Sequence, residues 1–494
     1  MSKSKKKTNV KWVTVAVFIA TFMTAVEGTI VSTAMPTIIG DLHGLSIMNW
    51  VFSIYLLMSA VTTPIYGKLS DRYGRKRLLN IGLLVFVIGS LLCGLSHTMM
   101  QLILSRTIQG LGAGAIQPLT YTVIADIYPL EKRANVIGLN GASWGIASII
   151  APLLGGFIVE QLSWHWVFVI NIPIGIITMI LLQVNLHEKI KPKKNRIDYS
   201  GIGLMTLGLI MLMLGLQNLN NPKFLMVSLI MIVFSVVTFI ALVFVEKRKQ
   251  DPILPLNLFN NRTFVIQNID MVLIAGFLMG FETYIPIWMQ AILGLKPSMG
   301  GFAVTPSSVL WLLGSFVSGK MIAKYPPHRI TAFALFFSLA GCLSLLLIPM
   351  KTSFFIFLII AAVLGFGFGL SITTSTVVSQ SVVNPMEIGT ATSFNTLARN
   401  LGQTLMVSIF GITMNTQMAK GVSHYPGLTL KMVNRMINPE TAGSLPAGML
   451  QSAKNVVFSG LHAIYLVSFI ILILAFIVNL FDFKSHKLLR EYQK

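Results

Sequence analysis

Charged residues are scarce in this sequence. They account for 11% of its 494 residues, whereas an average soluble protein has about 25%. Hydrophobic residues account for 54%, and the mean hydropathy is +0.77. A soluble enzyme of this composition would leave much apolar surface in water. The scarcity of charge therefore excludes that class and indicates an integral membrane protein.

Cysteine is also rare, and the groupings that hold disulfides, metals or nucleotides are missing. The two cysteines, Cys93 and Cys342, both lie in apolar runs, which excludes a disulfide framework and a CxxC site. The eight histidines are scattered singly, without the helical spacing of metal-ligand pairs. No Walker A sequence is present. We therefore expect no metal, no cofactor, no ATP requirement and no enzyme activity.

Acidic residues are the rarer charge, with 16 Asp and Glu against 37 Lys and Arg, for a net charge of +21. In a soluble chain this imbalance would suggest nucleic acid. The sequence has no platform of interleaved aromatic and basic residues for such binding. The basic residues instead concentrate between apolar runs, where they report on membrane orientation.

Fourteen apolar runs are long enough to cross a bilayer, which takes about 20 residues in a helix. Their approximate ranges are 12–35, 49–69, 78–96, 101–126, 134–159, 166–186, 200–219, 224–245, 264–292, 299–323, 330–349, 353–381, 388–416 and 457–481. Most Lys and Arg residues then share one side, so both termini are predicted to be cytoplasmic. The basic start resembles a signal peptide, but no cleavage site follows a short apolar region, which indicates an uncleaved first span.

A weak internal repeat organises these spans. The segments 67–79, 110–114 and 128–141 are echoed in order at 319–331, 365–369 and 384–397, an offset of about 250 residues. Two parallel six-helix halves with a cavity between them would follow. The prediction is a six-helix half at 1–196, two inserted helices at 197–250 and a second half at 251–494. The segment 417–456 is predicted to be an outer surface loop rather than a span.

Four motifs identify a family. The segment GKLSDRYGRKRLL follows span 2, LSRTIQGLGAG lies in span 4, GASWGIASIIAPLLGG in span 5, and WHWVFVINIPIG opens span 6. Together they resemble the fourteen-helix drug:proton antiporter branch of the major facilitator superfamily, over essentially the whole chain. The resemblance implies an all-α membrane fold of fourteen helices, arranged six plus two plus six.

Two of these motifs have roles that the resemblance implies. In span 5, small residues recur on one helical face, which in antiporters seals the two halves; simple helix packing is the alternative. This antiporter motif consists of Gly141, Gly145, Ser148, Pro152, Gly155 and Gly156.

The loop after span 2 latches the outward-facing state in the family, although any inner loop tends to be basic. Its residues here are Gly67, Asp71, Arg72, Gly74 and Arg75, with Asp126 placed to pair with one of the arginines.

The second copy of this loop differs from the first. Ala323 stands where Asp71 stands in the first copy. The predicted latch is therefore asymmetric.

Two arginines fall inside spans, where a charge costs about 2.5 to 3.5 kcal/mol on insertion scales. Arg106 in span 4 shares a face with Gln109 and Gln117, and Asn395 and Arg399 share a face in span 13. These faces are predicted to line the cavity. Pairing with backbone or hydrogen bonding to neighbouring helices is the alternative.

Three carboxylates also fall within spans, and burial disfavours their charged form. Glu27 in AVEGTIVSTAMP resembles the first-helix acid of the family and shares a sector with Thr24; a structural ion pair with Arg106 is the alternative. Glu282 lies near Phe281, Tyr284 and Trp288, and a carboxylate with aromatic faces can hold a cation. Asp270 lies closer to the interface.

The predicted function is proton-driven export of hydrophobic, cationic drugs from a bacterial cell, a basis for antibiotic resistance. Glu27 and Glu282 are predicted to bind protons and cargo, with Arg106 modulating protonation. The expected partners are protons, small molecules and membrane lipids, in a monomer of the cell membrane without nucleic acid. Two alternatives stay open: an exporter of a lipid, fatty acid or endogenous metabolite, and a non-transporting sensor or scaffold.

Overall fold

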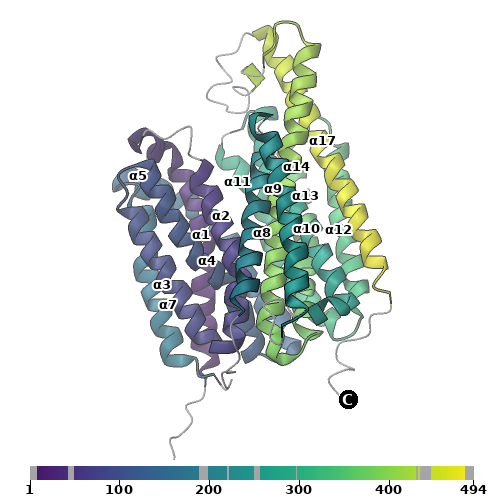
Figure 1. Ribbon diagram of the computed structural model, residues 1–494. Coiled ribbons are helices and arrows are strands. Elements are labelled where there is room, and N and C mark those ends of the chain that lie inside the picture. The colour runs from purple at the N-terminus through teal and green to yellow at the C-terminus, as the bar shows by residue number, and fades with distance from the viewer. Residues whose placement is uncertain are drawn as a thin grey trace, which may run out of the picture. The chain divides into compact units, whose positions relative to one another are not determined.

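The structure is a computed structural model, and it describes residues 8–42, 49–188, 198–219, 222–249, 256–295, 297–429, 432–433 and 447–483. Helices make up nearly all of this part of the chain (Figure 1). A helix satisfies its backbone hydrogen bonds internally, as the interior of a bilayer demands. The long apolar runs of the sequence therefore become helices.

The helices follow one another with short connections. In the first part of the chain they are α1 (Val10–Leu42), α2 (Asn49–Tyr73), α3 (Arg75–Gly94), α4 (Met99–Ile127), α5 (Leu130–Gln161), α6 (Trp166–Val169), α7 (Asn171–Asn185), α8 (Tyr199–Asn218) and α9 (Leu225–Glu246). Then come α10 (Arg262–Ile287), which continues as a π-helical turn (Trp288–Ile292), α11 (Pro297–Ile322), α12 (Pro327–Leu347), α13 (Phe354–Ser381), α14 (Ile388–His424) and α17 (Ala447–Leu480).

Each predicted span coincides with one of these helices, with α6 and α7 together covering the sixth. Among the described residues, eleven helical stretches are long and apolar enough to cross a membrane. The helices α4, α5 and α14 are not in that set. The predicted count of fourteen spans is therefore plausible, although only eleven of the described helical stretches meet the length and hydropathy criteria for a span.

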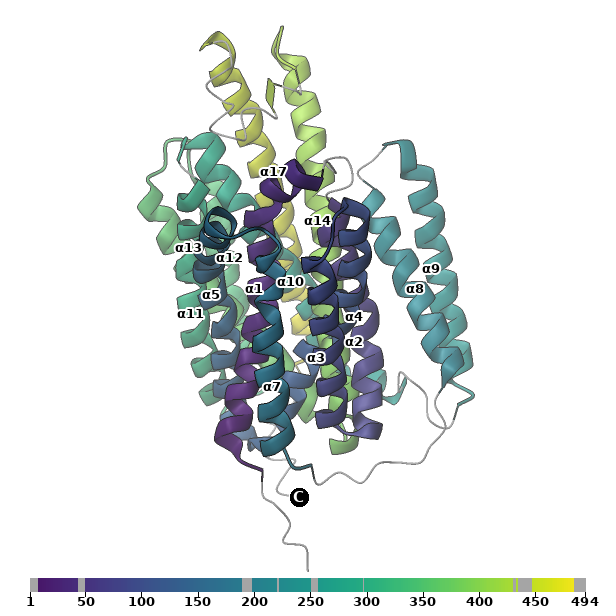
Figure 2. The ribbon, with the colours of Figure 1, turned by 90° about the vertical axis from the view of Figure 1, so that its left-hand side faces the viewer.

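The predicted outer segment at 417–456 is helical at both ends. Helix α14 continues to His424 and α17 begins at Ala447, and the two lie side by side beyond the predicted membrane boundary (Figures 1 and 2). The 37 residues of α14 extend for about 55 Å at 1.5 Å per residue, much more than a hydrocarbon core of about 30 Å. The residues 430–431 and 434–446 lie outside the described part of the chain.

The chain forms two compact units. Unit 1 comprises Met1–Met213, Met231–Phe264 and Ser379–Leu397, and unit 2 comprises Leu214–Ile230, Val265–Val378 and Ala398–Lys494. The start of α14 thus belongs to unit 1. The six-plus-two-plus-six division stays a prediction, and its boundaries at 196/197 and 250/251 fall outside the described residues.

Unit 1 is held together by close helix packing. Helix α3 packs along α4 and α7, and α1 packs along α5 and α7, as Figure 2 shows for α1, α3 and α7. A Cβ atom at Gly112 of α4 would collide with backbone atoms of Gly82 and Phe86 in α3. A glycine at this position therefore lets the two helices approach closely, as small residues do in membrane interfaces.

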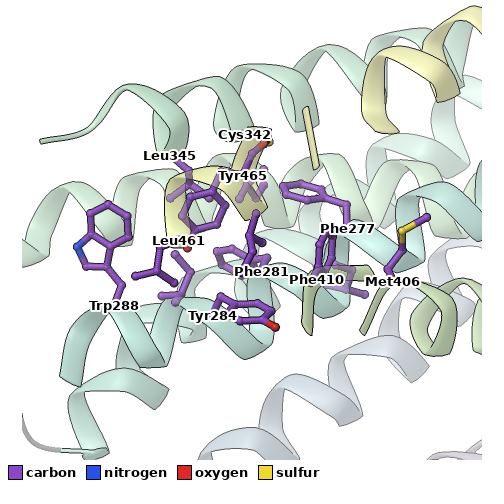
Figure 3. Close-up of a cluster of buried hydrophobic side chains, with 14 of the residues drawn as sticks. Phe277, Phe281, Tyr284, Trp288, Cys342, Leu345, Met406, Phe410, Leu461 and Tyr465 are labelled. Atoms are coloured by element: carbon purple, nitrogen blue, oxygen red, sulfur yellow. The ribbon is translucent and has the colours of Figure 1, made fainter. Parts of the chain in front are cut away.

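Unit 2 has an apolar core built from the inner faces of α10, α12, α13, α14 and α17. Several aromatic rings lie among its aliphatic side chains, and ten of its residues are labelled in Figure 3. Trp288 is fully buried, with its ring 5.5 Å from that of Phe357 and 5.4 Å from that of Phe458. Such ring pairs add to the stability gained by burial.

Substituting Gly112→Ala should destabilise unit 1 by about 1–3 kcal/mol, because the added methyl group meets backbone that cannot move independently. Gly203→Ala in α8 is the matched control, since a Cβ there meets nothing within 4 Å. The control should be neutral or stabilising by up to about 1 kcal/mol. Thermal unfolding of the purified variants in detergent measures both. Equal unfolding temperatures for the two variants would contradict the packing described.

Candidate functional site

A buried ion pair lies at the centre of unit 1. Glu27 of α1 is 0% exposed and Arg106 of α4 is 1% exposed. The Arg106 Nη1 atom donates a hydrogen bond to Oε1 of Glu27. The first-helix acid and the arginine of span 4, 79 residues apart in sequence, are therefore direct partners.

Other side chains complete the hydrogen bonding of this pair. Asn171 of α7 donates to the second Glu27 oxygen, Oε2, over 2.6 Å. Arg106 also donates from Nη1 to Gln109 Oε1 over 2.6 Å, and Gln109 donates in turn to the Ser90 hydroxyl over 2.7 Å. Both oxygens of the buried carboxylate thus accept a hydrogen bond, as a buried charge requires. We call Glu27, Arg106, Gln109, Asn171 and Ser90 the unit 1 polar cluster.

The guanidinium of Arg106 has two further partners. Its Nε atom donates to the backbone carbonyl of Val51 over 3.1 Å. Its Cζ atom lies 4.2 Å from the ring centroid of Tyr55, a cation–π contact. Arginine suits this position because its planar head can donate in several directions while a face stacks on a ring. The buried arginine therefore links α1, α2 and α4.

Sequence reasoning missed Asn171, Ser90 and Tyr55. Asn171 lies within the quoted motif that opens span 6, and its polar side chain in an apolar run was the available signal. Ser90 gave a weaker signal, because serine hydroxyls in membrane helices commonly bond to their own backbone. Nothing in the sequence pattern distinguishes Tyr55 from other aromatic residues.

Three other predicted cavity residues lie outside the unit 1 polar cluster. Thr24 is buried, and its hydroxyl donates to the Thr21 carbonyl of its own helix over 2.9 Å. Gln117 lies about two turns beyond Gln109 along α4 and is half-buried. Asn395, near the start of α14, is buried and donates to Ser379 over 3.4 Å. Their roles in lining a cavity stay predictions.

The antiporter motif lies on one continuous helix. Helix α5 runs from Leu130 to Gln161 and packs along α1, which carries Glu27. Gly141 is half-buried and Gly155 is buried. The backbones of Gly145, Ser148, Pro152 and Gly156 are helical. The sealing role of this motif stays a prediction.

In unit 2, Glu282 is exposed although it lies well inside a transmembrane helix. The charge of Arg399 on α14 lies close enough to act on it, and Arg399 itself is 9% exposed. The structure therefore presents an acid of unit 2 in a different environment from that of Glu27.

The predicted aromatic cage around Glu282 is wrong for two of its three rings. Phe281 is 1% and Trp288 0% exposed, and both lie in the apolar core of unit 2 (Figure 3). Successive residues of a helix are turned by about 100°, so Phe281 and Glu282 belong to different faces. Tyr284 is 9% exposed and also packs into this core, 6.2 Å from the ring of Phe410.

The C-terminal end of α2, which carries Asp71, binds the start of α14. Asp71 accepts hydrogen bonds from the backbone nitrogens of Gly389 over 3.1 Å and Thr390 over 2.8 Å, and from the Thr390 hydroxyl over 2.8 Å. These nitrogens belong to the first turn of α14, where backbone donors are free and the helix dipole favours an anion. Asp71 thus caps a helix that is over 300 residues away in sequence.

Arg75, the first residue of α3, joins an acid of α2 to an acid of α4. It pairs with Asp71 over 2.8 Å and with Asp126 at the end of α4 over 3.1 Å. The structure therefore pairs Asp126 with an arginine of the loop, whereas Arg72 lies over the ring of Tyr73. Gly74 has a φ of 94°, which only glycine adopts readily. Gly67 lies against Ser393 of α14.

Comparisons with known proteins agree with this architecture. The sequence model of the "Major Facilitator Superfamily" matches residues 17–407. The chain is 32% identical to "Multidrug resistance protein 3" of Bacillus subtilis (strain 168), over 97% of this chain and 96% of the relative. It is 35% identical to "Multidrug efflux pump SdrM" of Staphylococcus aureus (strain N315), over 80% of this chain and 88% of the relative.

A solved structure shares the fold. The human organic anion transporter MFSD10 (TETRAN) superposes with a TM-score of 0.64 at 12% sequence identity, covering 94% of this chain and 99% of that chain. At this identity the likeness concerns the fold alone. It confirms the fold class that the sequence motifs predicted.

Substituting Arg106→Met should destabilise the protein by about 3–5 kcal/mol, because it leaves the buried Glu27 carboxylate without its cation. The loss should be smaller at about pH 6 than at about pH 8, since a proton can neutralise Glu27 in the variant. Thermal unfolding at the two pH values measures this. The double variant Glu27→Gln with Arg106→Met, which has no buried charge, should regain much of the loss. An equal loss at both pH values without rescue would contradict the pairing.

Proposed function

The chain belongs to the major facilitator superfamily and is therefore a multi-pass membrane transporter, and we propose that it exports hydrophobic, cationic compounds from bacterial cells in exchange for protons. The observation that supports this most is the fully buried pair of Glu27 and Arg106. Two relatives, one named a multidrug resistance protein and one a multidrug efflux pump, support export of drug-like compounds. The proposed orientation places both termini in the cytoplasm, and the two six-helix halves would alternate in access.

The buried pair can act as a proton-controlled switch. With Glu27 ionised, its charge and that of Arg106 compensate each other in a dry environment. Binding of a proton to Glu27 would remove one charge and leave Arg106 without its anionic partner. The two protonation states thus favour different arrangements of α1, α4 and α7, which is what coupling to a conformational change requires.

Glu282 is suited to the cargo. A carboxylate inside a membrane helix is stable next to water or a cation rather than lipid, and this one is exposed. A cationic drug could replace a proton there, while Arg399 limits how strongly the cation is held. Aromatic stacking around Glu282 is not part of this proposal, because Phe281 and Trp288 lie in the core.

The proton gradient supplies enough energy for such an exchange. Each pH unit contributes about 1.4 kcal/mol per proton, equivalent to about a tenfold accumulation of cargo. Each 100 mV of membrane potential adds about 2.3 kcal/mol per charge. Proton binding outside and release inside would drive export without nucleotide hydrolysis.

Replacing Glu27 by Gln should remove gradient-driven transport while leaving cargo binding measurable, because an amide keeps hydrogen bonds but cannot ionise. Glu282→Gln should instead weaken binding of cationic cargo. Uptake of a fluorescent cation into inverted vesicles with an imposed pH gradient measures both, and Glu131→Gln, an exposed acid at the start of α5, is the control.

Each variant should reduce cation uptake by about tenfold or more when the imposed gradient is one pH unit. If both variants transport like the control, the mechanism is wrong. Gradient-driven uptake of anions but not cations would contradict the cargo class.

Substituting Asp71→Asn should slow transport more than Asp126→Asn does. Asp71 binds both Arg75 and the first turn of α14, whereas Asp126 binds Arg75 from a side chain that is 29% exposed. Hydrogen bonds to a charged group are worth about 1.5–3 kcal/mol each, so loss of the Asp71 charge should weaken this latch most. Initial transport rates in the same vesicles measure the order. The reverse order would argue against a latch formed by Asp71 and α14.

A further inference from the structure

Asn171 belongs to the unit 1 polar cluster, but the proposed mechanism gives its side chain no role. It is the first residue of α7 and is 2% exposed. Its amide nitrogen, Nδ2, donates to Oε2 of Glu27 over 2.6 Å, while Arg106 donates to the other oxygen, Oε1. Asn171 is therefore the partner of the second carboxylate oxygen.

Helix packing fixes this contact. Helices α1 and α7 pack along each other. One turn beyond Asn171, a Cβ atom at Gly175 would collide with Val87 of α3 and would touch the sulfur of Met23. Met23 lies one turn before Glu27 on α1. The glycine thus keeps α7 close to α1 and α3 at the level of the carboxylate.

The charged and titratable groups around Glu27 are few. The charge that acts on it is that of Arg106. The phenol of Tyr55 on α2 and the thiol of Cys93 on α3 both experience the charge of Glu27, and such groups are mostly neutral at neutral pH. Helices α6 and α7 contain no charged residue, and the charged residues of α5 lie in its first and last turns. Besides Arg106, hydrogen bonds therefore decide which protonation state Glu27 holds.

A protonated Glu27 needs an acceptor for its O–H group. Arginine has only N–H donors, so Arg106 cannot accept it. Gln109 is held on both sides, since its carbonyl accepts from Arg106 over 2.6 Å and its nitrogen donates to Ser90 over 2.7 Å. The Asn171 amide has no second hydrogen bond within the described part of the chain, and turning it over exchanges its nitrogen for its oxygen. It can accept the proton without losing another partner.

We propose that Asn171 is a positioning residue for the proton of Glu27, and that this proton binds at Oε2. In the ionised state the Asn171 nitrogen donates to Oε2. When a proton binds there, the amide turns over, and its oxygen, Oδ1, accepts the new O–H group. Glu27 keeps a hydrogen bond to α7 in both protonation states, and the orientation of the Asn171 amide reports to α7 which state is present.

The inference rests on the proposed function, in which Glu27 binds and releases a proton, but it does not depend on the cargo. A hydrogen bond to a charged carboxylate is stronger than one between neutral groups. The Asn171 amide therefore favours the ionised form of Glu27 more than it favours the protonated form. Its removal should let Glu27 bind a proton at higher pH.

Titration of Glu27 in the purified protein tests this without any transport. The infrared band of its protonated carboxyl group is isolated by subtracting the spectrum of the same protein carrying Glu27→Gln. Asn171→Leu is branched at the same carbon but has no donor or acceptor, and it should move the midpoint of this band up by about one pH unit, because a hydrogen bond to a charged group is lost. Asn171→Gln, which keeps an amide, should stay closer to the wild type.

Asn185→Leu is the matched control on the same helix. The Asn185 side chain donates to the Leu181 carbonyl of its own helix over 2.9 Å, so this variant should titrate like the wild type. A second readout is the position of the band. In Asn171→Leu, the carbonyl stretch of protonated Glu27 should lie at a higher frequency than in the wild type, because its O–H group has lost its acceptor.

The outcomes separate this inference from the proposed function. A wild-type midpoint and band position in Asn171→Leu would overturn the role of Asn171 and leave the proposed function standing. If wild-type Glu27 binds no proton at any pH at which the protein is folded, both fail.

Folding of the variant is also informative. If Asn171→Leu does not fold alone, the double variant with Glu27→Gln decides. Folding of the double variant supports the proposal, because no carboxylate is left to stabilise, and its failure to fold would show that Asn171 has a structural role only.

Discussion

The pairing of Glu27 with Arg106 is the interaction on which unit 1 depends. A charge inside a bilayer is stable only with a partner or with water, and each of these two residues is the other's partner. Their hydrogen bonds also recruit Val51 from α2 and Asn171 from α7. The centre of unit 1 is therefore organised by the need to compensate one negative charge. Any change in its protonation must be felt by all four helices.

The acids inside the helices lie in three different environments. Glu27 is buried and paired with a cation, Glu282 is exposed, and Asp270 is buried with no hydrogen-bond partner for either oxygen. Each environment places a different demand on the charge of its carboxyl group, because burial without a partner disfavours the charged form and pairing with a cation favours it.

Sequence patterns predicted the helices and the family because length, hydropathy and motif order are one-dimensional properties. They also identified Glu27 and Arg106 as charged residues inside spans. The ion pair between them was only one of the alternatives, because a sequence pattern does not show which side chains meet. Phe281 and Glu282 show the limit most clearly: neighbours in sequence, they lie on different helix faces, one in the core and one exposed. The helical ends of the outer loop were missed because a polar helix outside the membrane has no apolar run.

The contact of Asp71 with α14 differs in kind from the buried pair. Most of its hydrogen bonds come from a helix N-terminus and a neighbouring hydroxyl, groups that water can replace when the helices separate. Such a contact can form and break at a modest cost, whereas separating the buried ion pair would leave two uncompensated charges in a dry environment. The second sequence copy has Ala323 in place of this acid, so it has no carboxylate to cap a helix in the same way. In the proposed mechanism, closing one end of the molecule would depend on this carboxylate, while the coupling to protons would depend on the buried pair of Glu27 and Arg106.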